Sequence, residues 1–346
     1  MKNPIDGFQI DAETLGFVGH DLQRPECILA EPDGSLWAAD ARGGVMHIRS
    51  DGSQSLITQN IQDGFATSAD EADKFTKGTL PNGLAFAKNG DILISNFGTD
   101  RLEVMTRSGN SRVLFDQING RPIGKVNFVL RDNKGRVWLT VSTTIPNWME
   151  AVSPNLADGF IALADEKGLR IVADGFAFTN EIRLDANEEW LYVVETTGMR
   201  ITRLRVGADG TLSNRETFGP QSHGSFIDGI TFDAFGNLWG THIFTDRIFA
   251  LTPDGDLRIL LDDDHGSVAG KTLLAAFEQD CVTPQMQLAC GGTIAPWMAS
   301  VTFGGTDLQT VYIGSLRGTS IPFFRSPVAG LPMAHWNDGS FDVPSL

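Results

Sequence analysis

The sequence predicts an all-β fold, a six-bladed β-propeller, and three observations support this prediction. Short segments rich in aromatic and β-branched residues recur along the chain, and turn signals such as "PDG", "KNG" or "AFG" precede most of them. Their recurrence about every 45 to 70 residues is the scale of a propeller blade with four strands. The extensive helical periodicity that a parallel α/β fold needs is missing. Six such units in 346 residues therefore predict a single propeller domain over 1–346.

Six strands are expected at these recurring segments. In chain order they are 34–40 ("GSLWAAD"), 90–96 ("GDILISN"), 135–141 ("GRVWLTV"), 188–195 ("EEWLYVVE"), 236–242 ("GNLWGTH") and 308–315 ("LQTVYIGS"). The last segment is the weakest match to the pattern.

A second repeat precedes five of these strands and keeps one register. The segments read "PECILAEPDG", "PNGLAFAKNG", "VNFVLRDNKG", "TNEIRLDANE" and "IDGITFDAFG". The second residue of each can offer an oxygen, and these residues are Glu26, Asn82, Asn127, Asn180 and Asp228. Two places later each segment has an apolar residue, and the sixth unit, "MASVTFGG", has only Ser300 near this register. One such residue would be interpreted as a turn former. Five in one register predict a ring of side chains at one end of the central channel.

The chemistry of this ring favours a cation site. Carboxylates and amide oxygens that converge are costly to bury without a partner. A divalent cation held by Glu26, Asn127, Asn180 and Asp228 would supply one. An all-oxygen set suits Ca²⁺ or Mg²⁺, whereas structural zinc prefers thiolates or imidazoles. We expect Ca²⁺, with Mg²⁺, Mn²⁺ or Zn²⁺ as alternatives. Such a metal polarises a carbonyl or phosphoryl oxygen, and Asp228 is the candidate base or nucleophile, although chemistry alone leaves Glu26 open.

The blade-start motifs resemble those of the SMP-30/gluconolactonase/LRE-like proteins. The resemblance runs from about Arg24 to Arg317 and is carried by "RPECILAEPDGSLWAAD", "PNGLAFAKNGDILISN", "GFTNEIRLDANEEWLYVVET" and "IDGITFDAFGNLWGTH". It implies a six-bladed propeller with one divalent metal held by Glu, Asn, Asn and Asp, roles that map here onto Glu26, Asn127, Asn180 and Asp228. It also implies lactone hydrolysis, or organophosphate hydrolysis in some relatives, with Asp228 as metal ligand and as base or nucleophile.

Two positions depart from the usual pattern of that family. The chain has Asn127-Phe128 where the gluconolactonases usually read Asn-Asp, and Asn180-Glu181 where they read Asn-Gly. Loss of the Asp removes a polar contact to a hydroxylated sugar, and Phe128 makes the neighbourhood more apolar. We therefore expect a relatively apolar lactone or ester rather than a sugar lactone.

Five further residues are predicted to contact the substrate: Arg24, Asn82, Phe128, Trp148 and Glu181. Arg24 could orient a substrate anion or pair with Glu26. Two other functions stay open. One is a metal-dependent lyase, aldolase or isomerase that works through an enolate, with Glu181 as an extra acid or base. The other is a non-catalytic propeller binding protein, because a fold does not fix a function.

The net charge and the distribution of apolar residues limit the kinds of partner that this chain can bind. A net charge of −16 and a pI near 4.7 argue against nucleic acid and anionic membrane surfaces. The chain has no signal-peptide pattern at its start and no apolar run that could span a bilayer. We expect a cytoplasmic protein, monomeric or a small homo-oligomer, that acts on a small molecule.

Two insertions interrupt the blade pattern, near 61–80 and 262–297. The second contains a short expected helix, "KTLLAAFEQD". Long loops inside compact domains are often lids over a site. Capping of a sheet edge and an oligomer contact are the alternatives.

Overall fold

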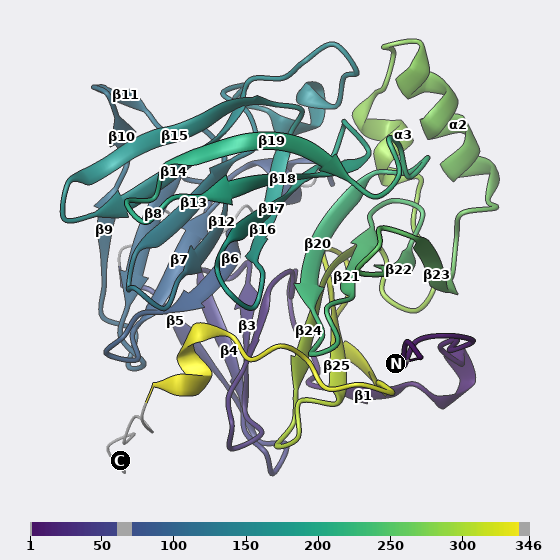
Figure 1. Ribbon diagram of the computed structural model, residues 1–346, viewed down its shortest axis with the longest axis horizontal. Helices are drawn as coiled ribbons and strands as arrows, with labels where there is room; N and C mark the ends of the chain where they lie inside the picture. Colours follow the sequence, from purple (N-terminus) through teal and green to yellow (C-terminus); the bar gives the residue numbers. More distant parts are fainter. Residues whose placement is uncertain (1, 61–70, 339–346) are drawn as a thin grey trace.

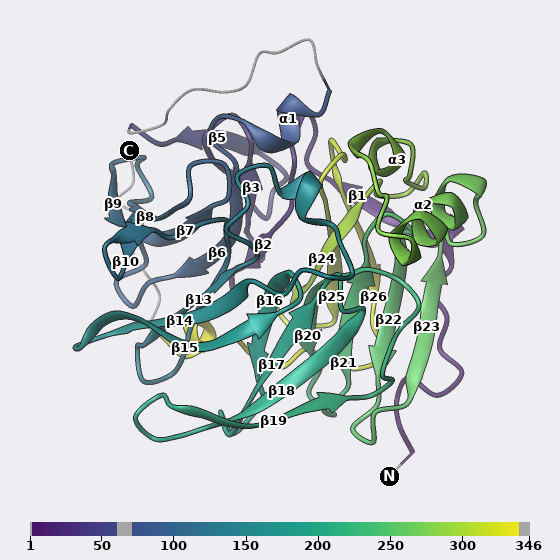
Figure 2. The ribbon, with the colours of Figure 1, turned by 90° about the horizontal axis from the view of Figure 1, so that it is seen from above.

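The computed structural model describes residues 2–60 and 71–338. Six four-stranded antiparallel sheets form the blades of a propeller (Figures 1 and 2). The predicted fold class is confirmed.

The strands of each blade follow one another in the chain, with one exception in blade 6. Blade 1 contains β2 (Ile28–Ala30), β3 (Leu36–Asp40), β4 (Gly44–Ile48) and β5 (Gln54–Thr58), and blade 2 contains β6 (Pro81–Phe86), β7 (Ile92–Asn96), β8 (Arg101–Met105) and β9 (Ser111–Phe115). Blade 3 contains β12 (Val126–Arg131), β13 (Val137–Val141), β14 (Gly159–Asp165) and β15 (Gly168–Phe176), and blade 4 contains β16 (Thr179–Leu184), β17 (Trp190–Glu195), β18 (Arg200–Val206) and β19 (Leu212–Phe218). Blade 5 contains β20 (Ile227–Phe232), β21 (Leu238–His242), β22 (Arg247–Leu251) and β23 (Leu257–Asp262), and blade 6 contains β24 (Met298–Gly304), β25 (Thr310–Ser315), β26 (Ile321–Arg325) and β1 (Gly16–Val18).

The closing blade joins the two ends of the propeller sequence. Strand β1 pairs antiparallel with β26, with Gly16 opposite Phe323 and Val18 opposite Ile321. The ring of blades is therefore closed by main-chain hydrogen bonds between segments at opposite ends of the propeller.

Each of the six strands expected from the sequence is the second strand of its blade, if the count begins at β2, β6, β12, β16, β20 or β24. They correspond to β3, β7, β13, β17, β21 and β25. The strand before each of them, β2, β6, β12, β16, β20 or β24, carries or directly follows the ring register. Packing between these first strands forms the buried apolar centre, which includes Leu84, Phe128 and Ile182.

An acid–tryptophan pair fixes the first hairpin in three blades. In each, the indole Nε1 donates to a carboxylate six residues earlier, and the pairs are Trp37–Glu31 at 2.6 Å, Trp138–Asp132 at 2.9 Å and Trp239–Asp233 at 2.9 Å. Asp233 also accepts from the backbone N–H groups of Phe235, Gly236 and Asn237, each at 2.9 Å. One buried carboxylate thus satisfies both the turn and the indole, which sets the register of the hairpin.

The remaining elements are short. They are η1 (Ala12–Thr14), α1 (Asp73–Thr76), β10 (Gln117–Ile118), β11 (Arg121–Pro122), η2 (Trp148–Ala151), α2 (Val268–Glu278), α3 (Pro284–Leu288) and η3 (Ala334–Asn337). Within the described ranges no helix is long and apolar enough to cross a membrane.

The second insertion contains the expected helix. Helix α2 begins after Ser267, whose side chain accepts from the Gly270 N–H, as a helix N-cap does. Figure 2 shows α2 beyond the end of β23 of blade 5, with α3 next to it on the side of blade 6. Leu273 and Phe277 of α2 pack in the same apolar cluster as Phe226 and Trp297. Of the first insertion, residues 61–70 lie outside the described part of the chain, and α1 lies in the remainder. The lid role of both insertions stays a prediction.

Candidate active site

A β-bulge interrupts the first strand of blades 2 to 6 at the position of the ring register. The register shifts fall between Pro81 and Leu84, Val126 and Phe128, Thr179 and Ile182, Ile227 and Ile230, and Met298 and Ser300. Bulges re-aim side chains and commonly occur beside active sites. Hydroxyl groups of the second strand accept from backbone N–H groups freed in this way: Thr140 from Phe128 at 3.0 Å, and Thr241 from Gly229 at 3.1 Å.

The sixth blade contributes no oxygen to the ring. The second residue of β24, which matches Asn180 and Asp228, is Ala299. Ser300 occupies the following position, and its hydroxyl donates to the backbone carbonyl of Glu26. Ser300 therefore supports the neighbouring blade and does not complete the ring.

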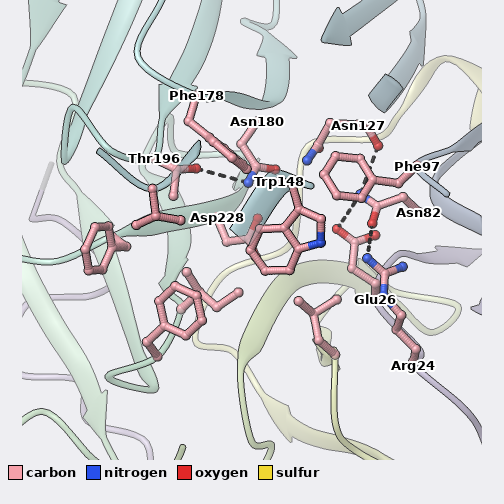
Figure 3. Close-up of a pocket in the computed structure, with 15 residues that line it drawn as sticks. Arg24, Glu26, Asn82, Phe97, Asn127, Trp148, Phe178, Asn180, Thr196 and Asp228 are labelled. Atoms are coloured by element: carbon pink, nitrogen blue, oxygen red, sulfur yellow. Dashed lines mark hydrogen bonds between the residues drawn. The ribbon is translucent and has the colours of Figure 1, made fainter. Parts of the chain in front are cut away.

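All five ring residues line one pocket at the mouth of the channel, as Figure 3 shows. Arg24, Trp148 and Thr196 line it as well. The empty space between its lining atoms is about 470 Å³, part of it open to solvent. The rest of its lining is apolar and includes five aromatic rings, those of Phe97, Trp148, Phe178, Phe226 and Phe244.

Asn82 links three neighbours of the ring. Its Nδ2 donates to Glu26 Oε1 at 3.0 Å and to the Asn127 backbone carbonyl at 2.9 Å. Its Oδ1 accepts from Arg24 Nη2 at 2.5 Å. Asn82 thus uses both ends of its amide within the protein and orients Glu26, so we do not include its oxygen in the candidate ligand set.

Three other ring oxygens are buried without a hydrogen-bond partner. They are Glu26 Oε2, Asn127 Oδ1 and Asn180 Oδ1. Asn180 is held in this orientation because its Nδ2 donates to Thr196 Oγ1 at 3.0 Å. Buried polar atoms in folded proteins normally have partners. Together with Asp228, these oxygens form an all-oxygen donor set that fits a hard divalent cation.

Burial and mutual repulsion act on the two ring carboxylates. Burial raises the pKa of Glu26 to about 8, against the opposing attraction of Arg24. Burial, followed by the charges of Glu26 and Glu181, raises the pKa of Asp228 well above its usual value. A bound cation would counter both effects. No cluster of three or more His, Cys, Asp or Glu side chains suited to a metal occurs in the parts of the chain that the structure describes, so the mixed carboxylate and amide set is the candidate.

The comparison with protein families shows to which family this chain belongs. The SMP-30/Gluconolactonase/LRE-like region matches residues 24–262, which include all five ring residues. This chain belongs to the SMP-30/gluconolactonase/LRE-like family. The resemblance that the blade-start motifs indicate is confirmed.

Individual relatives of this SMP-30-like chain are distant. A curated 6-deoxy-6-sulfogluconolactonase from Pseudomonas putida is 25% identical over 154 residues, which are 44% of this chain and 43% of the relative. The match thus spans less than half of that relative's length.

Solved structures share the fold over most of their length. A gluconolactonase from Xanthomonas campestris is 18% identical, with 90% of this chain and 89% of the other covered and a TM-score of 0.64. A luciferin-regenerating enzyme is 16% identical, with coverages of 92% and 99% and a TM-score of 0.64. The calcium-binding protein regucalcin from Agrobacterium tumefaciens is 14% identical, with coverages of 91% and 95% and a TM-score of 0.60.

Two residues predicted to contact substrate lie outside the pocket of this SMP-30-like chain. Glu181 is fully buried, and its Oε2 accepts from Arg183 Nη2 at 3.0 Å and from the Ile230 N–H at 3.1 Å. Phe128 is also fully buried, with the Arg183 guanidinium 4.5 Å from its ring centroid. The reason is the bulge, because the second residue of the strand reaches the pocket while the third packs in the channel below it.

The ionisation of Glu181 reflects this interior position. Burial outweighs the attraction of Arg183 and raises the pKa of Glu181 to about 7. The missing Cβ of Gly229 leaves room for this carboxylate, because a Cβ there would lie 3.1 Å from Glu181 Oε1 and 2.4 Å from the Ala299 carbonyl.

Sequence reasoning missed most of the aromatic wall. Phe178 and Phe226 stand two residues before Asn180 and Asp228, as Arg24 stands two residues before Glu26. The position two residues before a ring residue could therefore have been used to predict that Phe178 and Phe226 line the pocket. Phe97 and Phe244 follow the second strands of their blades, and no repeated register marks them.

Proposed function

We propose that this chain is a divalent-metal-dependent, lactonase-like hydrolase that opens a relatively apolar lactone or related ester. The observation that carries the proposal is the set of three buried, unpartnered oxygens, Glu26 Oε2, Asn127 Oδ1 and Asn180 Oδ1, in an aromatic-walled pocket beside Asp228. The family and the names of the curated relative and of the Xanthomonas structure support a lactonase-like reaction. The calcium-binding relative supports Ca²⁺ as the expected ion, with Mg²⁺, Mn²⁺ and Zn²⁺ as alternatives.

Glu26, Asn127, Asn180 and Asp228 would hold the cation. When bound, a divalent cation polarises the substrate carbonyl and stabilises the negative charge that develops on its oxygen. The protein prepares the donor set through two neighbours, since Asn82 orients Glu26 and Thr196 orients Asn180.

Asp228 performs the proton transfer in this mechanism. Its carboxylate accepts a proton from water while the water oxygen bonds to the carbonyl carbon. The bond between that carbon and the ring oxygen then breaks, and the leaving oxygen takes the proton from Asp228, so the product is a hydroxy acid. Direct attack by the Asp228 carboxylate, followed by hydrolysis of the acyl intermediate, is the second route.

The pocket walls select the substrate. The part of the lining other than the ring residues, Arg24 and Thr196 is apolar and includes five aromatic side chains, and this part favours a ring or alkyl group over a sugar with many hydroxyls. The ring carboxylates Glu26 and Asp228 are buried, and this burial strengthens the electrostatic interactions inside the site.

The lyase, aldolase or isomerase alternative has less support. It used Glu181 as an extra acid or base, and this side chain is buried outside the pocket with Arg183. The cytoplasmic location, the absence of nucleic-acid and membrane partners and the oligomeric state stay predictions.

The test is a panel of aromatic, alkyl and sugar lactones and esters. Chelated protein receives Ca²⁺, Mg²⁺, Mn²⁺ or Zn²⁺, and hydrolysis is measured alongside cation affinity by calorimetry. We expect turnover only with a cation, and an Asp228→Asn variant without turnover. The matched control is Asp254→Asn, because Asp254 lies in an exposed turn. Full activity in chelated protein or in Asp228→Asn would contradict the mechanism. A protein that binds none of the four cations and hydrolyses no substrate after their addition would favour a binding protein.

A further inference from the structure

Arg24 lies at the boundary between two hollows. It lines the aromatic pocket, and it also lines a second hollow beside blade 1 with about 1010 Å³ of empty space, part of it open to solvent. Leu316 lines both hollows as well. The aromatic pocket and the second hollow thus share two lining residues, and a ligand that reached from one to the other would lie against Arg24.

The Arg24 guanidinium is buried and fixed. Arg24 is 6% exposed and has a φ of 57°, in the left-handed region that non-glycine residues rarely adopt. Its Nη1 donates to the Pro81 carbonyl at 3.0 Å, and its Nη2 donates to Asn82 Oδ1. These bonds use two of the five N–H groups of an arginine, and Nε is buried without a partner.

No carboxylate forms a salt bridge with Arg24 in the described parts of the chain. Both hydrogen bonds of its guanidinium go to neutral oxygens. In the proposed cation site, Glu26 and Asp228 balance the two charges of the cation. Below the ring, the charges of Glu181 and Arg183 balance each other. Arg24 attracts Glu26 and Asp228 as well, but with a cation bound these two carboxylates are shared between the cation and Arg24, so the pocket keeps one net positive charge.

The charged residues that line the second hollow are also mostly positive. Among the residues that the structure describes, its charged lining residues are three basic groups, Arg24, Lys74 and Arg317, and one acidic group, Glu71. Arg317 pairs with Glu71 at 3.0 Å. On a chain with a net charge of −16, a hollow with a basic excess is a local exception that attracts anions.

We propose that the natural substrate is an aromatic or alkyl lactone or ester that carries one carboxylate, and that Arg24 binds this carboxylate where the two hollows meet. The apolar part fills the aromatic pocket and the carboxylate faces the basic hollow. Arg24 is thus a specificity-determining residue. This inference rests on the proposed function for the reaction, but its recognition element can be measured without turnover.

The binding test uses two probes of equal shape, 3-phenylpropionate and 3-phenylpropanamide, with the Ca²⁺-loaded protein. Charge-assisted hydrogen bonds predict that the carboxylate binds about 10- to 150-fold more tightly than the amide. Arg24→Met should remove this preference, and Arg24→Lys should keep part of it. Calcium affinity, measured on each variant, reports whether the ring is intact. Equal binding of the two probes to the wild type would overturn the proposal. So would a preference that persists in Arg24→Met, because the carboxylate would then be recognised by the cation alone.

The kinetic test compares a neutral aromatic lactone with its carboxylated counterpart. Wild type should favour the charged lactone through a lower KM, and Arg24→Met should lose that advantage. Lys74→Ala should raise the KM of the charged lactone by about 1.5- to 5-fold, as for an exposed charge. Its matched control is Lys77→Ala, because Lys77 does not line the hollow and pairs with Asp73 at 2.8 Å. Arg24-dependent carboxylate binding without hydrolysis of any lactone would refute the proposed function and leave the recognition site standing.

Discussion

Removal of the Thr196 hydroxyl tests how the protein aims a cation ligand. Thr196 Oγ1 accepts from Asn180 Nδ2 at 3.0 Å, and this bond leaves Asn180 Oδ1 as a buried atom without a partner. Thr196→Val keeps the shape of the side chain but removes the acceptor. The Asn180 amide then loses the contact that fixes which end faces the ring.

The magnitude follows from this one bond. A hydrogen bond of this kind contributes about 0.5 to 1.5 kcal/mol, so cation affinity should fall roughly 2- to 13-fold. Partners that orient metal ligands typically have effects of at least this size. The assay is calorimetric titration of chelated protein with Ca²⁺, which needs no substrate.

The neighbouring threonine provides the control. Thr197 is 5% exposed, and its Oγ1 is buried without a hydrogen-bond partner. Thr197→Val should therefore leave cation affinity within about 2-fold of wild type, because no bond is lost. Wild-type affinity in Thr196→Val, or an equal loss in Thr197→Val, would refute this reasoning.

Three further predictions concern stability. Asp233→Ala leaves the buried Trp239 indole N–H and the hairpin turn without their acceptor, and should lower the unfolding free energy by about 2 to 4 kcal/mol in urea titrations. Glu181→Leu leaves the Arg183 guanidinium buried and unpaired and should cost about 3 to 5 kcal/mol, whereas the double variant with Arg183→Met should recover at least half of that loss. Burial lowers the pKa of His335 from 6.5 to about 4, so the unfolded state binds the proton more readily and stability is lost as pH falls from 6.5 through 4. The difference in unfolding free energy between wild type and His335→Gln should shrink by about 3 kcal/mol over that interval.

Each of these predictions has a contrary result. Asp256→Ala is the control for the first, since Asp256 pairs only with exposed Arg258 at 3.5 Å and should change stability by less than about 0.5 kcal/mol. Equal losses in both variants would show that the turn carboxylate has no special role. A double variant no more stable than Glu181→Leu would mean that the unpaired charge is not the cause. A difference between wild type and His335→Gln that stays constant with pH would exclude the imidazole as the titrating group.

The blades and the ring were predictable because both rest on repetition. One register placed Asn127, Asn180 and Asp228 at equivalent positions, and equivalent positions in successive blades face the same axis. The expected strands correspond to the second strands of the blades for the same reason. The repetition of the blades thus allowed a weak local sequence pattern to predict which side chains lie together in space.

What the sequence could not show depends on contacts outside the repeat. Glu181 looked like a pocket residue because it follows Asn180 directly, but the bulge turns the two side chains to different depths. Asn82 shares the register, yet only its bonds to Arg24 and Glu26 reveal that its amide is already used. Phe244 reaches the pocket from the turn between β21 and β22, which no periodic pattern marks.

The pairing of β1 with β26 also bears on how the chain folds. Its partners are separated by nearly the whole propeller, so their contact has a high loop-closure cost and should form late. Glu26 lies at the seam that this contact closes, where its backbone carbonyl accepts from Ser300 of blade 6. The cation ligands therefore come into place only when the propeller closes. Because this state forms after the folding transition state, a bound divalent cation should slow unfolding rather than speed folding.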